Sequence, residues 1–426
     1  MARLLALALA GSATATSDQH NFTVRLGAVT HEVTTRHMGC HLDSGFGQEL
    51  LGLHSNIVFS PSFEYGDPTE EPDPEKNPEG LGWVPSFGSK AQGALEMTAD
   101  ALHGKSALAV KYYGGSGPLG VGNRGIGNEG LYLSGSKPYE GYLFAAADVN
   151  SGSGAGGGVL HVELQNYETG AVLASQQLTV PAGSNWTRYN LSLTPTAGTE
   201  CVGIPPGSDP QITCDWKPGS DQDAAAHVCI KCAGQLFIGL AQPGAVAVDF
   251  VYLEPGEWGR FKGLPVLKPM ADALQTMGVK LFRAGGTVAD SMFWKDWRGP
   301  MWKRKPLVWR NNEVSGFGPF ETIDLCAAAG ILPVMTTAAA DQTAEDMGDL
   351  IEQLLRTNGC FVIHVPQFIP DSGSIDDICM PGVGTRLAIK QPSGGSCGTR
   401  TNIRSRTTSP GSSWGTSSRI HSSRSR

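Results

Sequence analysis

Two stretches decide the fold: Val279-Lys-Leu-Phe-Arg-Ala-Gly-Gly-Thr287 and, after a long loop, Gly316-Phe-Gly-Pro-Phe-Glu-Thr-Ile-Asp-Leu-Cys-Ala-Ala-Ala-Gly-Ile-Leu-Pro-Val-Met335. The apolar start of the first stretch indicates a buried strand. The second stretch indicates a short helix that ends at Gly330, followed by another buried strand from Ile331. Strands that alternate with helices predict a parallel sheet, and functional loops leave the carboxyl edge of such a sheet.

A polar residue and two glycines stand where the first of these strands ends. Arg283 follows the apolar run, and a polar residue at the carboxyl end of a barrel strand is a candidate for ligand binding. Gly285 and Gly286 come next, so the backbone can turn sharply or approach a ligand closely. We therefore expect all three residues in a binding site. A structural arginine that pairs with a neighbouring carboxylate explains Arg283 equally well.

The order and spacing of these residues resemble glycoside hydrolase family 51, the α-L-arabinofuranosidases. That family carries a Phe-Leu-Arg-Phe-Pro-Gly-Gly motif, then a Trp-Lys segment ending in Gly-Pro, then a Gly-rich segment ending in Glu-Pro-Val. The matching residues are Phe282, Arg283, Gly285, Gly286, Trp294, Lys295, Gly299, Pro300, Gly316, Gly318, Phe320, Leu325, Cys326, Gly330, Pro333 and Val334. Ala284 stands where the family has proline, and Thr287 where it often has cysteine.

The resemblance implies a multidomain chain: a partial (β/α)8 TIM-type barrel of about three units, an inserted antiparallel β-sandwich and a disordered C-terminal tail. It places Arg283, Gly285, Gly286 and Trp294 at a sugar pocket, together with Asp43 from an earlier strand end. A packed loop tryptophan and a polar turn residue are equally good interpretations of Trp294 and Asp43. The implied substrate is a terminal non-reducing α-L-arabinofuranosyl group of a cell-wall polysaccharide, and polymer preference stays open.

The carboxylates that this chemistry needs are absent from the sequence. Retaining hydrolysis uses one carboxyl group as acid/base and a second, roughly 5 Å away, as nucleophile. In the resembled family both are glutamates, on the fourth and seventh strands, and neither motif occurs here. The remaining glutamates of this region stand in the wrong context: Glu313, Glu321, Glu345 and Glu352. We expect the chain as given to be inactive, and no cofactor or metal is expected, because carboxylates alone carry the reaction.

Two other functions stay open: a non-catalytic secreted carbohydrate-binding protein, and a structural wall glycoprotein with no ligand site. Residues 76–255 bear on the first, because short alternating runs between Gly, Ser, Asn and Pro clusters predict an antiparallel β-sandwich. Exposed aromatic rings on such a domain can stack on sugars. The candidates are Tyr112, Tyr113, Tyr132, Tyr139, Trp186 and Tyr189. For each of them, packing in the core or at the rim is the simpler interpretation.

The N-terminus predicts secretion. A basic residue and an apolar run precede Ala13-Thr14-Ala15, which fits a signal peptide over residues 1–15. Three glycosylation sequons agree with this prediction: Asn21, Asn185 and Asn190. In a secreted chain, disulfides are a better interpretation than zinc for Cys201, Cys214, Cys229 and Cys232. A net charge of −8 argues against a nucleic-acid partner, and no stretch is long and apolar enough to span a membrane.

The expected organisation is a signal peptide at 1–15, a first barrel strand and linker at 16–75, the sandwich at 76–255, the partial barrel at 256–358 and an aberrant tail at 359–426. Helices are expected near 265–277 and 341–355, the latter with Asp341 as a possible cap. After Asp377 the tail has no Asp or Glu, and its Ser, Gly and Arg content indicates disorder.

A second interpretation of the tail is translation in a shifted register. Serine codons are permissive, so the codons for Ser412 to Ser418, read one base earlier, can spell Phe-Glu-Leu-Gly-Asn-Glu-Gln. This is the acid/base motif of the resembled family. In this hypothesis the shifted register begins near Arg386, and residues 358–385 come from an unspliced or mis-joined segment.

Overall fold

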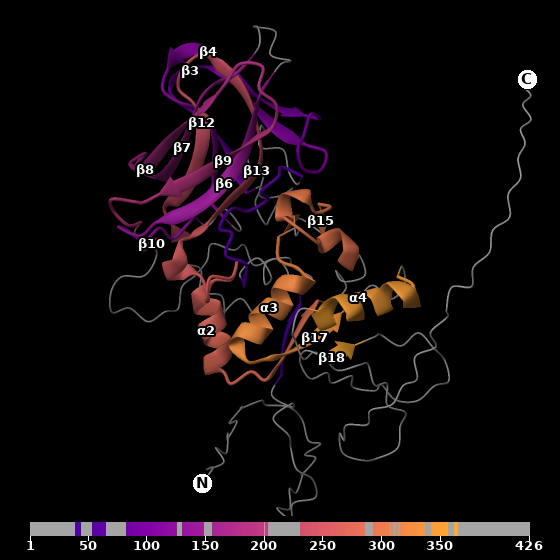
Figure 1. Ribbon diagram of the computed structural model, residues 1–426. Coiled ribbons are helices and arrows are strands. Elements are labelled where there is room, and N and C mark those ends of the chain that lie inside the picture. Colours follow the sequence, from indigo (N-terminus) through magenta and orange to yellow (C-terminus); the bar gives the residue numbers. More distant parts are fainter. Residues whose placement is uncertain are drawn as a thin grey trace, which may run out of the picture.

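The computed structural model describes residues 39–43, 53–64, 82–125, 130–148, 156–199, 201–202, 231–285, 293–306, 308–309, 312–313, 316–336, 342–356 and 362–364. The expected signal peptide, Asn21, Gly286 and Asp341 lie outside the described residues, as does the expected tail at 359–426 except for residues 362–364. Those three residues form a strand that pairs with the parallel sheet, so the predicted boundary of the tail at 359 is wrong. In the described part, antiparallel β-sheets dominate and helices are few (Figure 1).

Two five-stranded antiparallel sheets form the upper part of the molecule in Figure 1. The first has the order β2 (Trp83–Phe87), β5 (Leu119–Asn123), β12 (Gly234–Leu240), β7 (Gly158–Asn166) and β8 (Val172–Val180). The second has the order β3 (Lys90–Thr98), β4 (Ala107–Ser116), β13 (Gly244–Pro255), β6 (Tyr139–Ala147) and β9 (Thr187–Leu193). The antiparallel sheets predicted for residues 76–255 are therefore confirmed.

The core of this sandwich follows from the two-residue period of its strands. On β7, Leu160, Val162 and Leu164 are completely buried, whereas the intervening His161 and Glu163 are partly exposed. Successive side chains of a strand point to opposite faces, so one face of each sheet is apolar and the two apolar faces pack together. Both sheets contribute to one cluster, which includes Leu236, Ile238 and Leu240 of β12 and Val246 and Val248 of β13.

A short antiparallel pair, β10 (Cys201–Val202) and β11 (Lys231–Cys232), sets Cys201 opposite Cys232. Cys232 is disulfide-bonded, which confirms for this residue the disulfide interpretation over a zinc site. Cys214 and Cys229 lie outside the described residues.

A four-stranded parallel sheet forms the lower part of the molecule (Figure 1). Its order is β1 (Gly39–Asp43), β14 (Leu281–Gly285), β17 (Leu332–Thr336) and β18 (Val362–His364). The helices between these strands are α2 (Lys268–Thr276), α3 (Pro319–Ala329) and α4 (Ala344–Arg356). Buried residues of helices and strands meet in one core, which includes Leu274, Phe282, Leu325 and Ile331.

The helix ends are set by local chemistry. Gly330 ends α3 with a φ of 72°, a left-handed conformation that favours glycine. At the start of α4, the Asp346 N–H donates to Thr343 Oγ1 over 3.1 Å, and the Thr343 N–H donates to Asp346 Oδ2 over 3.2 Å. This reciprocal pair is a capping arrangement, so Thr343 is the cap rather than the expected Asp341.

Two long connections leave the carboxyl ends of neighbouring strands. The whole sandwich is inserted between β1 and α2. The connection from β14 to α3 contains η7 (Trp294–Trp297), η8 (Met301–Lys303), β15 (Val308–Trp309) and β16 (Asn312–Glu313). In parallel sheets these connections lie on the edge where ligands bind, so both are placed to shape a site.

Candidate functional site

The parallel sheet brings the expected strand-end residues together. In the register of β1 and β14, Asp43 stands opposite Gly285, and His41 stands opposite Arg283. Arg283 is half-buried and also stands opposite Val334 of β17. One carboxyl edge therefore presents an aspartate, an arginine and a glycine from adjacent strands, and Gly286 follows directly in the sequence.

Trp294 is buried by neighbouring helices and does not form an open pocket wall. Its side chain is only 4% exposed, and its Nε1 donates to the Asp346 carbonyl oxygen over 3.0 Å. Its ring meets Phe320 edge to face at a centroid distance of 6.5 Å. Trp294 therefore packs the loop after β14 against the starts of α3 and α4.

The neighbouring Lys295 strengthens this contact. Its ammonium lies 2.5 Å from Asp346 Oδ1 and 3.3 Å from Asp349 Oδ2. The hydrogen bonds from Lys295 and Thr343 lower the pKa of Asp346 to about 2, so this carboxylate stays ionised well into the acid range. The loop is thus joined to the α4 start by both an indole hydrogen bond and an ion pair.

None of the four glutamates considered above stands at the carboxyl end of a described strand of the parallel sheet. Glu321 is buried in α3, where it accepts from Arg304 Nη2 over 2.6 Å and from the Gly318 N–H over 2.9 Å. Glu313 lies on β16, and Glu345 and Glu352 lie on α4. These positions give Glu321 a structural role and leave the other three off the strand ends.

The loop after β14 also packs on the sandwich. We call this contact the junction cluster: Tyr142, Phe144, Phe250 and Tyr252 of the second sheet, with Leu102, Trp186, Met301 and Trp302 against them. Trp302 meets Tyr142 edge to face at 5.2 Å. The Arg188 guanidinium lies 4.0 Å from the Tyr142 ring centroid and 4.8 Å from that of Trp302. Cation–π contacts of this kind hold the loop against the sheet.

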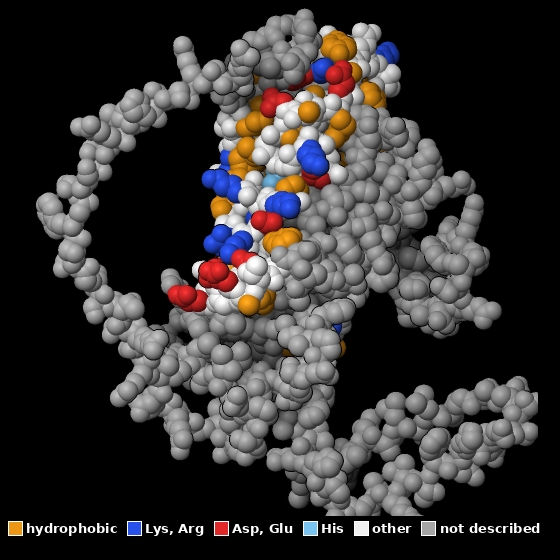
Figure 2. Space-filling model, turned by 90° about the vertical axis from the view of Figure 1, so that its right-hand side faces the viewer, with side chains coloured by type: hydrophobic (Ala, Val, Ile, Leu, Met, Phe, Trp, Pro, Cys, Tyr) orange, Lys and Arg blue, Asp and Glu red, His pale blue; other side chains and the backbone are white. Residues whose placement is uncertain are grey.

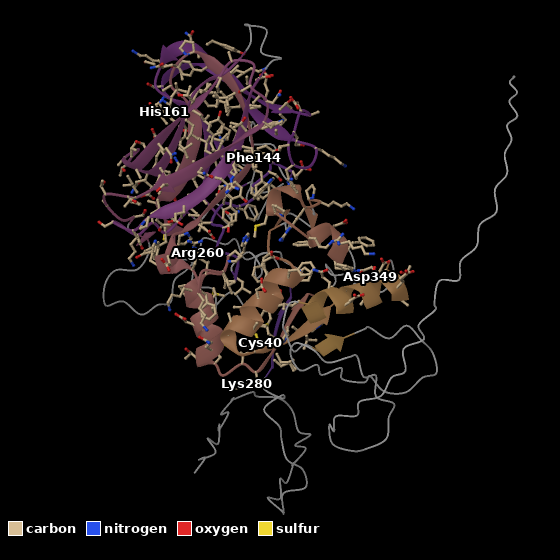
Figure 3. The ribbon with its side chains drawn as sticks, in the orientation of Figure 1. Cys40, Phe144, His161, Arg260, Lys280 and Asp349 are labelled. Atoms are coloured by element: carbon tan, nitrogen blue, oxygen red, sulfur yellow. The ribbon has the colours of Figure 1, made fainter. Side chains whose placement is uncertain are left out.

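A set of hydrogen bonds to the Glu254 carboxylate lies next to Tyr252 of the junction cluster. Glu254 accepts hydrogen bonds from Ser55 Oγ, from Tyr252 Oη at 2.7 Å and from Arg260 Nη1 at 3.0 Å. Burial and the adjacent Glu254 raise the pKa of Tyr252 well above its usual value, so its hydroxyl stays protonated as a donor. Arg260 lies where the sandwich meets the helices (Figure 3).

A buried histidine, His54, lies between the sandwich and the residues that precede α3. The His54 ring lies 5.7 Å from that of Tyr252 and 6.2 Å from that of Phe317. Burial, and secondarily the charge of Arg304, lowers the pKa of His54 to about 3, so the ring is neutral at physiological pH. Sequence reasoning missed His54, Arg304 and Trp302. The one available signal was that Trp302, two residues after Pro300, is followed by three basic residues at 303–305.

The aromatic candidates of the sandwich divide into two groups. Tyr112 and Tyr139 are core residues, each 2% exposed. Tyr113 and Tyr132 are 58% and 63% exposed, so their ring faces can meet a ligand. Trp186 and Tyr189 are half-buried. Of these six candidates, Tyr113 and Tyr132 are the two that are exposed enough to meet a ligand.

Two of the three sequons lie on described surface. Asn185 is exposed just before β9, and Thr187 Oγ1 donates to its carbonyl oxygen over 2.9 Å. Asn190 is exposed on β9, the edge strand of the second sheet. Both side chains are therefore accessible to a modifying enzyme.

Three further observations concern surface charge, helix length and groups of metal-binding side chains. Figure 2 shows acidic and basic side chains interspersed on the face that it presents, without a broad patch of one sign. Among the helices of the described residues, none is long and apolar enough to cross a membrane. The described part of the chain also contains no group of three or more His, Cys, Asp or Glu placed to hold a metal ion.

Comparison with known proteins gives a resemblance at the level of the fold. No protein-family model and no curated protein matches this sequence. Among solved structures, an arabinose-bound GH51 α-L-arabinofuranosidase is similar with a TM-score of 0.53 and 21% identity, over 76% of this chain and 49% of the other. The chain thus spans about half the length of that solved enzyme.

Carbohydrate-binding modules are similar to smaller parts. A CBM4 domain matches with a TM-score of 0.27 and 14% identity, over 46% of this chain and 99% of the module. A CBM22 xylan-binding domain from Paenibacillus barcinonensis matches with a TM-score of 0.24 and 14% identity, over 48% and 96%. These scores are too low to assign the fold of the sandwich.

Proposed function

We propose that the gene encodes a retaining α-L-arabinofuranosidase of the GH51 type, secreted and directed at cell-wall polysaccharide. In this proposal the parallel sheet is part of a (β/α)8 barrel, of which the described residues supply four strands and three helices. The observation that carries the proposal is the strand register that sets Asp43, Arg283 and Gly285 on one carboxyl edge. The similarity of the fold to that of the solved α-L-arabinofuranosidase supports it.

The strand-end residues have distinct proposed roles. The Arg283 guanidinium is a fixed fork of donors suited to sugar oxygens, and Asp43 supplies an acceptor from the adjacent strand. Gly285 and Gly286 let the backbone approach the ring closely. Trp294 acts through the loop, because its indole fixes the η7 segment to α4 rather than facing the ligand.

For the chain as given we propose binding without hydrolysis, which is also the second candidate function. The two-glutamate mechanism needs an acid/base and a nucleophile at strand ends. Glu321 cannot serve, because its carboxylate accepts hydrogen bonds from Arg304 and from the Gly318 N–H at the start of α3. The exposed rings of Tyr113 and Tyr132 favour a carbohydrate-binding role in this case.

The test uses the purified full-length chain. We expect it to be retarded in gels that contain arabinan or arabinoxylan, and to release no arabinose. Arg283→Ala should weaken binding at least about tenfold, because a charge-assisted contact is lost. Lys280→Ala, at an exposed position just before β14, is the matched control and should bind normally. Absence of binding by the wild-type chain would refute a carbohydrate ligand.

Secretion and glycosylation are tested separately. Expression in a secretory eukaryotic host should place the chain in the medium, with glycan mass at Asn185 and Asn190 that an amidase removes. Asn185→Gln and Asn190→Gln should each remove one glycan. A chain retained in the cell and unmodified at both sites would contradict the proposal.

The shifted register is tested at the nucleotide level. We expect the transcript beyond residue 358 to encode, one base earlier, the Glu-Leu-Gly-Asn-Glu motif and the rest of a barrel. The chain translated in that register should release arabinose from arabinan. A transcript that encodes the present tail in frame, without such a motif in any register, would leave only the binding function.

A further inference from the structure

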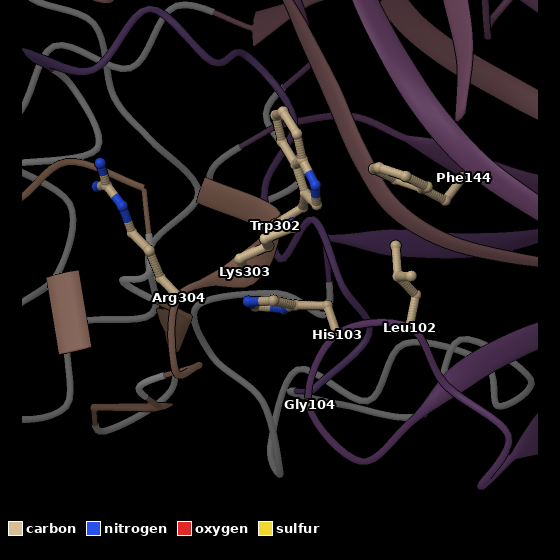
Figure 4. Close-up of a pocket in the computed structure, with 7 residues that line it drawn as sticks. All are labelled: Leu102, His103, Gly104, Phe144, Trp302, Lys303 and Arg304. Carbon is tan, nitrogen blue, oxygen red and sulfur yellow. The ribbon is translucent and has the colours of Figure 1, made fainter. Parts of the chain in front are cut away.

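A cavity of about 490 Å³ lies where the sandwich meets the loop after β14 (Figure 4). The sandwich side supplies Leu102, His103 and Phe144, and the loop side supplies Trp302 and Lys303. We call this the junction pocket. Its volume falls within the range of about 300–1,000 Å³ that is usual for small-ligand sites.

The two walls of the junction pocket belong to two connections that leave the same edge of the parallel sheet. Its first wall belongs to the connection after β1, and its second wall to the connection after β14. Both connections leave the carboxyl edge on which Asp43 and Arg283 stand. The connections that leave the strand ends therefore also build the junction pocket.

The walls are held in place without a ligand. The ring centroid of Phe144 lies 5.8 Å from that of Trp302, which also contacts Tyr142 and the Arg188 guanidinium. The backbone N–H of His103 donates to Asp249 Oδ2 over 2.8 Å, and its Nδ1 lies 2.9 Å from Ser62 Oγ. A preformed pocket loses little conformational entropy when a ligand binds.

Arg304 fixes the position of Lys303 next to it. Its guanidinium bonds Glu321 at 2.6 Å and the carbonyl oxygens of Gly316 at 2.8 Å and Gly299 at 3.1 Å. Figure 4 shows the Arg304 side chain turned away from Phe144 and Leu102. Its charge is therefore neutralised by Glu321, whereas the neighbouring lysine remains available.

The charges around the pocket favour an anion. Lys303 is exposed, and within the described residues its ammonium has no ion-pair partner. Two carboxylates lie near the walls, one of them against Gly104, and both accept hydrogen bonds from backbone N–H groups. Asp249 accepts from the Leu102 and His103 N–H groups, and Glu64 accepts from the Lys105 and Ser106 N–H groups. Among the described residues that line the pocket, none is acidic.

We propose that the junction pocket binds a uronic acid branch of the wall polysaccharide. The apolar face of its ring lies against Trp302 and Phe144, and its carboxylate meets Lys303. Aromatic rings stack on the C–H faces of sugars, and an ammonium–carboxylate contact selects the acid over a neutral sugar. The inference rests on the proposed function, because it takes its ligand from the same class of polymer.

The test is calorimetric titration of the full chain with a glucuronosyl-branched xylo-oligosaccharide and with its carboxyl-reduced form, at low ionic strength. We expect the acidic form to bind about tenfold more tightly, a preference that salt weakens. Lys303→Ala should abolish that preference and leave the affinity for the carboxyl-reduced oligosaccharide unchanged. Lys305→Ala is the control: this lysine is 71% exposed and lies 3.8 Å from Asp296, so the preference should persist.

Other outcomes separate this inference from the proposed function. Equal affinity for the two oligosaccharides, or an unchanged preference in Lys303→Ala, would overturn the junction pocket as a uronic acid site. Arg283→Ala should keep the acid preference while it loses arabinan binding, and Lys303→Ala should keep arabinan binding. Because Lys303 is exposed, its replacement should leave the fold intact, which circular dichroism checks.

Discussion

Replacement of Glu321 by alanine should strongly destabilise the region between α3 and the sandwich. The Arg304 and Glu321 side chains are only 6% and 10% exposed, and they meet at 2.6 Å. The variant leaves a buried guanidinium without its counter-charge and also removes the acceptor for the Gly318 N–H. Breaking a buried pair from one side costs about 3–5 kcal/mol, and loss of the helix-start acceptor adds about 1 kcal/mol.

Urea unfolding followed by tryptophan fluorescence measures this effect, because Trp297 and Trp302 lie in the loop that Arg304 holds. A double variant, Arg304→Met with Glu321→Leu, should recover most of the loss, since it removes both charges together. Asp272→Ala is the control. It breaks the exposed pair of Asp272 with Lys268 on α2, and should cost less than about 0.5 kcal/mol. A loss below about 1 kcal/mol in Glu321→Ala would refute the structural role of this pair.

Three further measurements probe other parts of the chain. Gly330→Ala should cost about 1 kcal/mol in urea unfolding, since φ is 72° although a methyl group there would touch nothing within 4 Å. His54 titrates near 3 when folded and 6.5 when unfolded, so the unfolded state binds more protons between these values. The free energy of unfolding should therefore fall as pH drops from 6.5 to about 3, by up to ~1.4 kcal/mol per pH unit, and the melting temperature of His54→Gln should depend less on pH. Burial raises the pKa of Cys326 to about 12, so iodoacetamide at pH 8 should label it only after denaturation, as peptide mass spectrometry would show.

Local periodicity explains which elements could be predicted. The alternation of buried and exposed residues on β7 predicts a sandwich strand whichever partners it has. The apolar spacing before Gly330, with glycine free to adopt a positive φ, likewise predicts where α3 ends. Both features depend on residues a few positions apart, so the sequence contains them directly.

The site depended on contacts that no local pattern contains. Asp43 meets Gly285 only because the chain returns to the same sheet after the whole sandwich. The position of Trp294 is decided by a carbonyl group 52 residues away, and that of Arg304 by a glutamate 17 residues away.

The sequence by itself thus determined the two kinds of sheet and the residues at the strand ends, because hydrophobic period and glycine conformation act locally. Tertiary structure alone decided that Glu321 is a buried counter-ion, that Thr343 rather than Asp341 caps α4, and that Trp302 closes a pocket against Phe144. These outcomes depend on which charged and aromatic groups are removed from water together. That is a property of packing between distant segments.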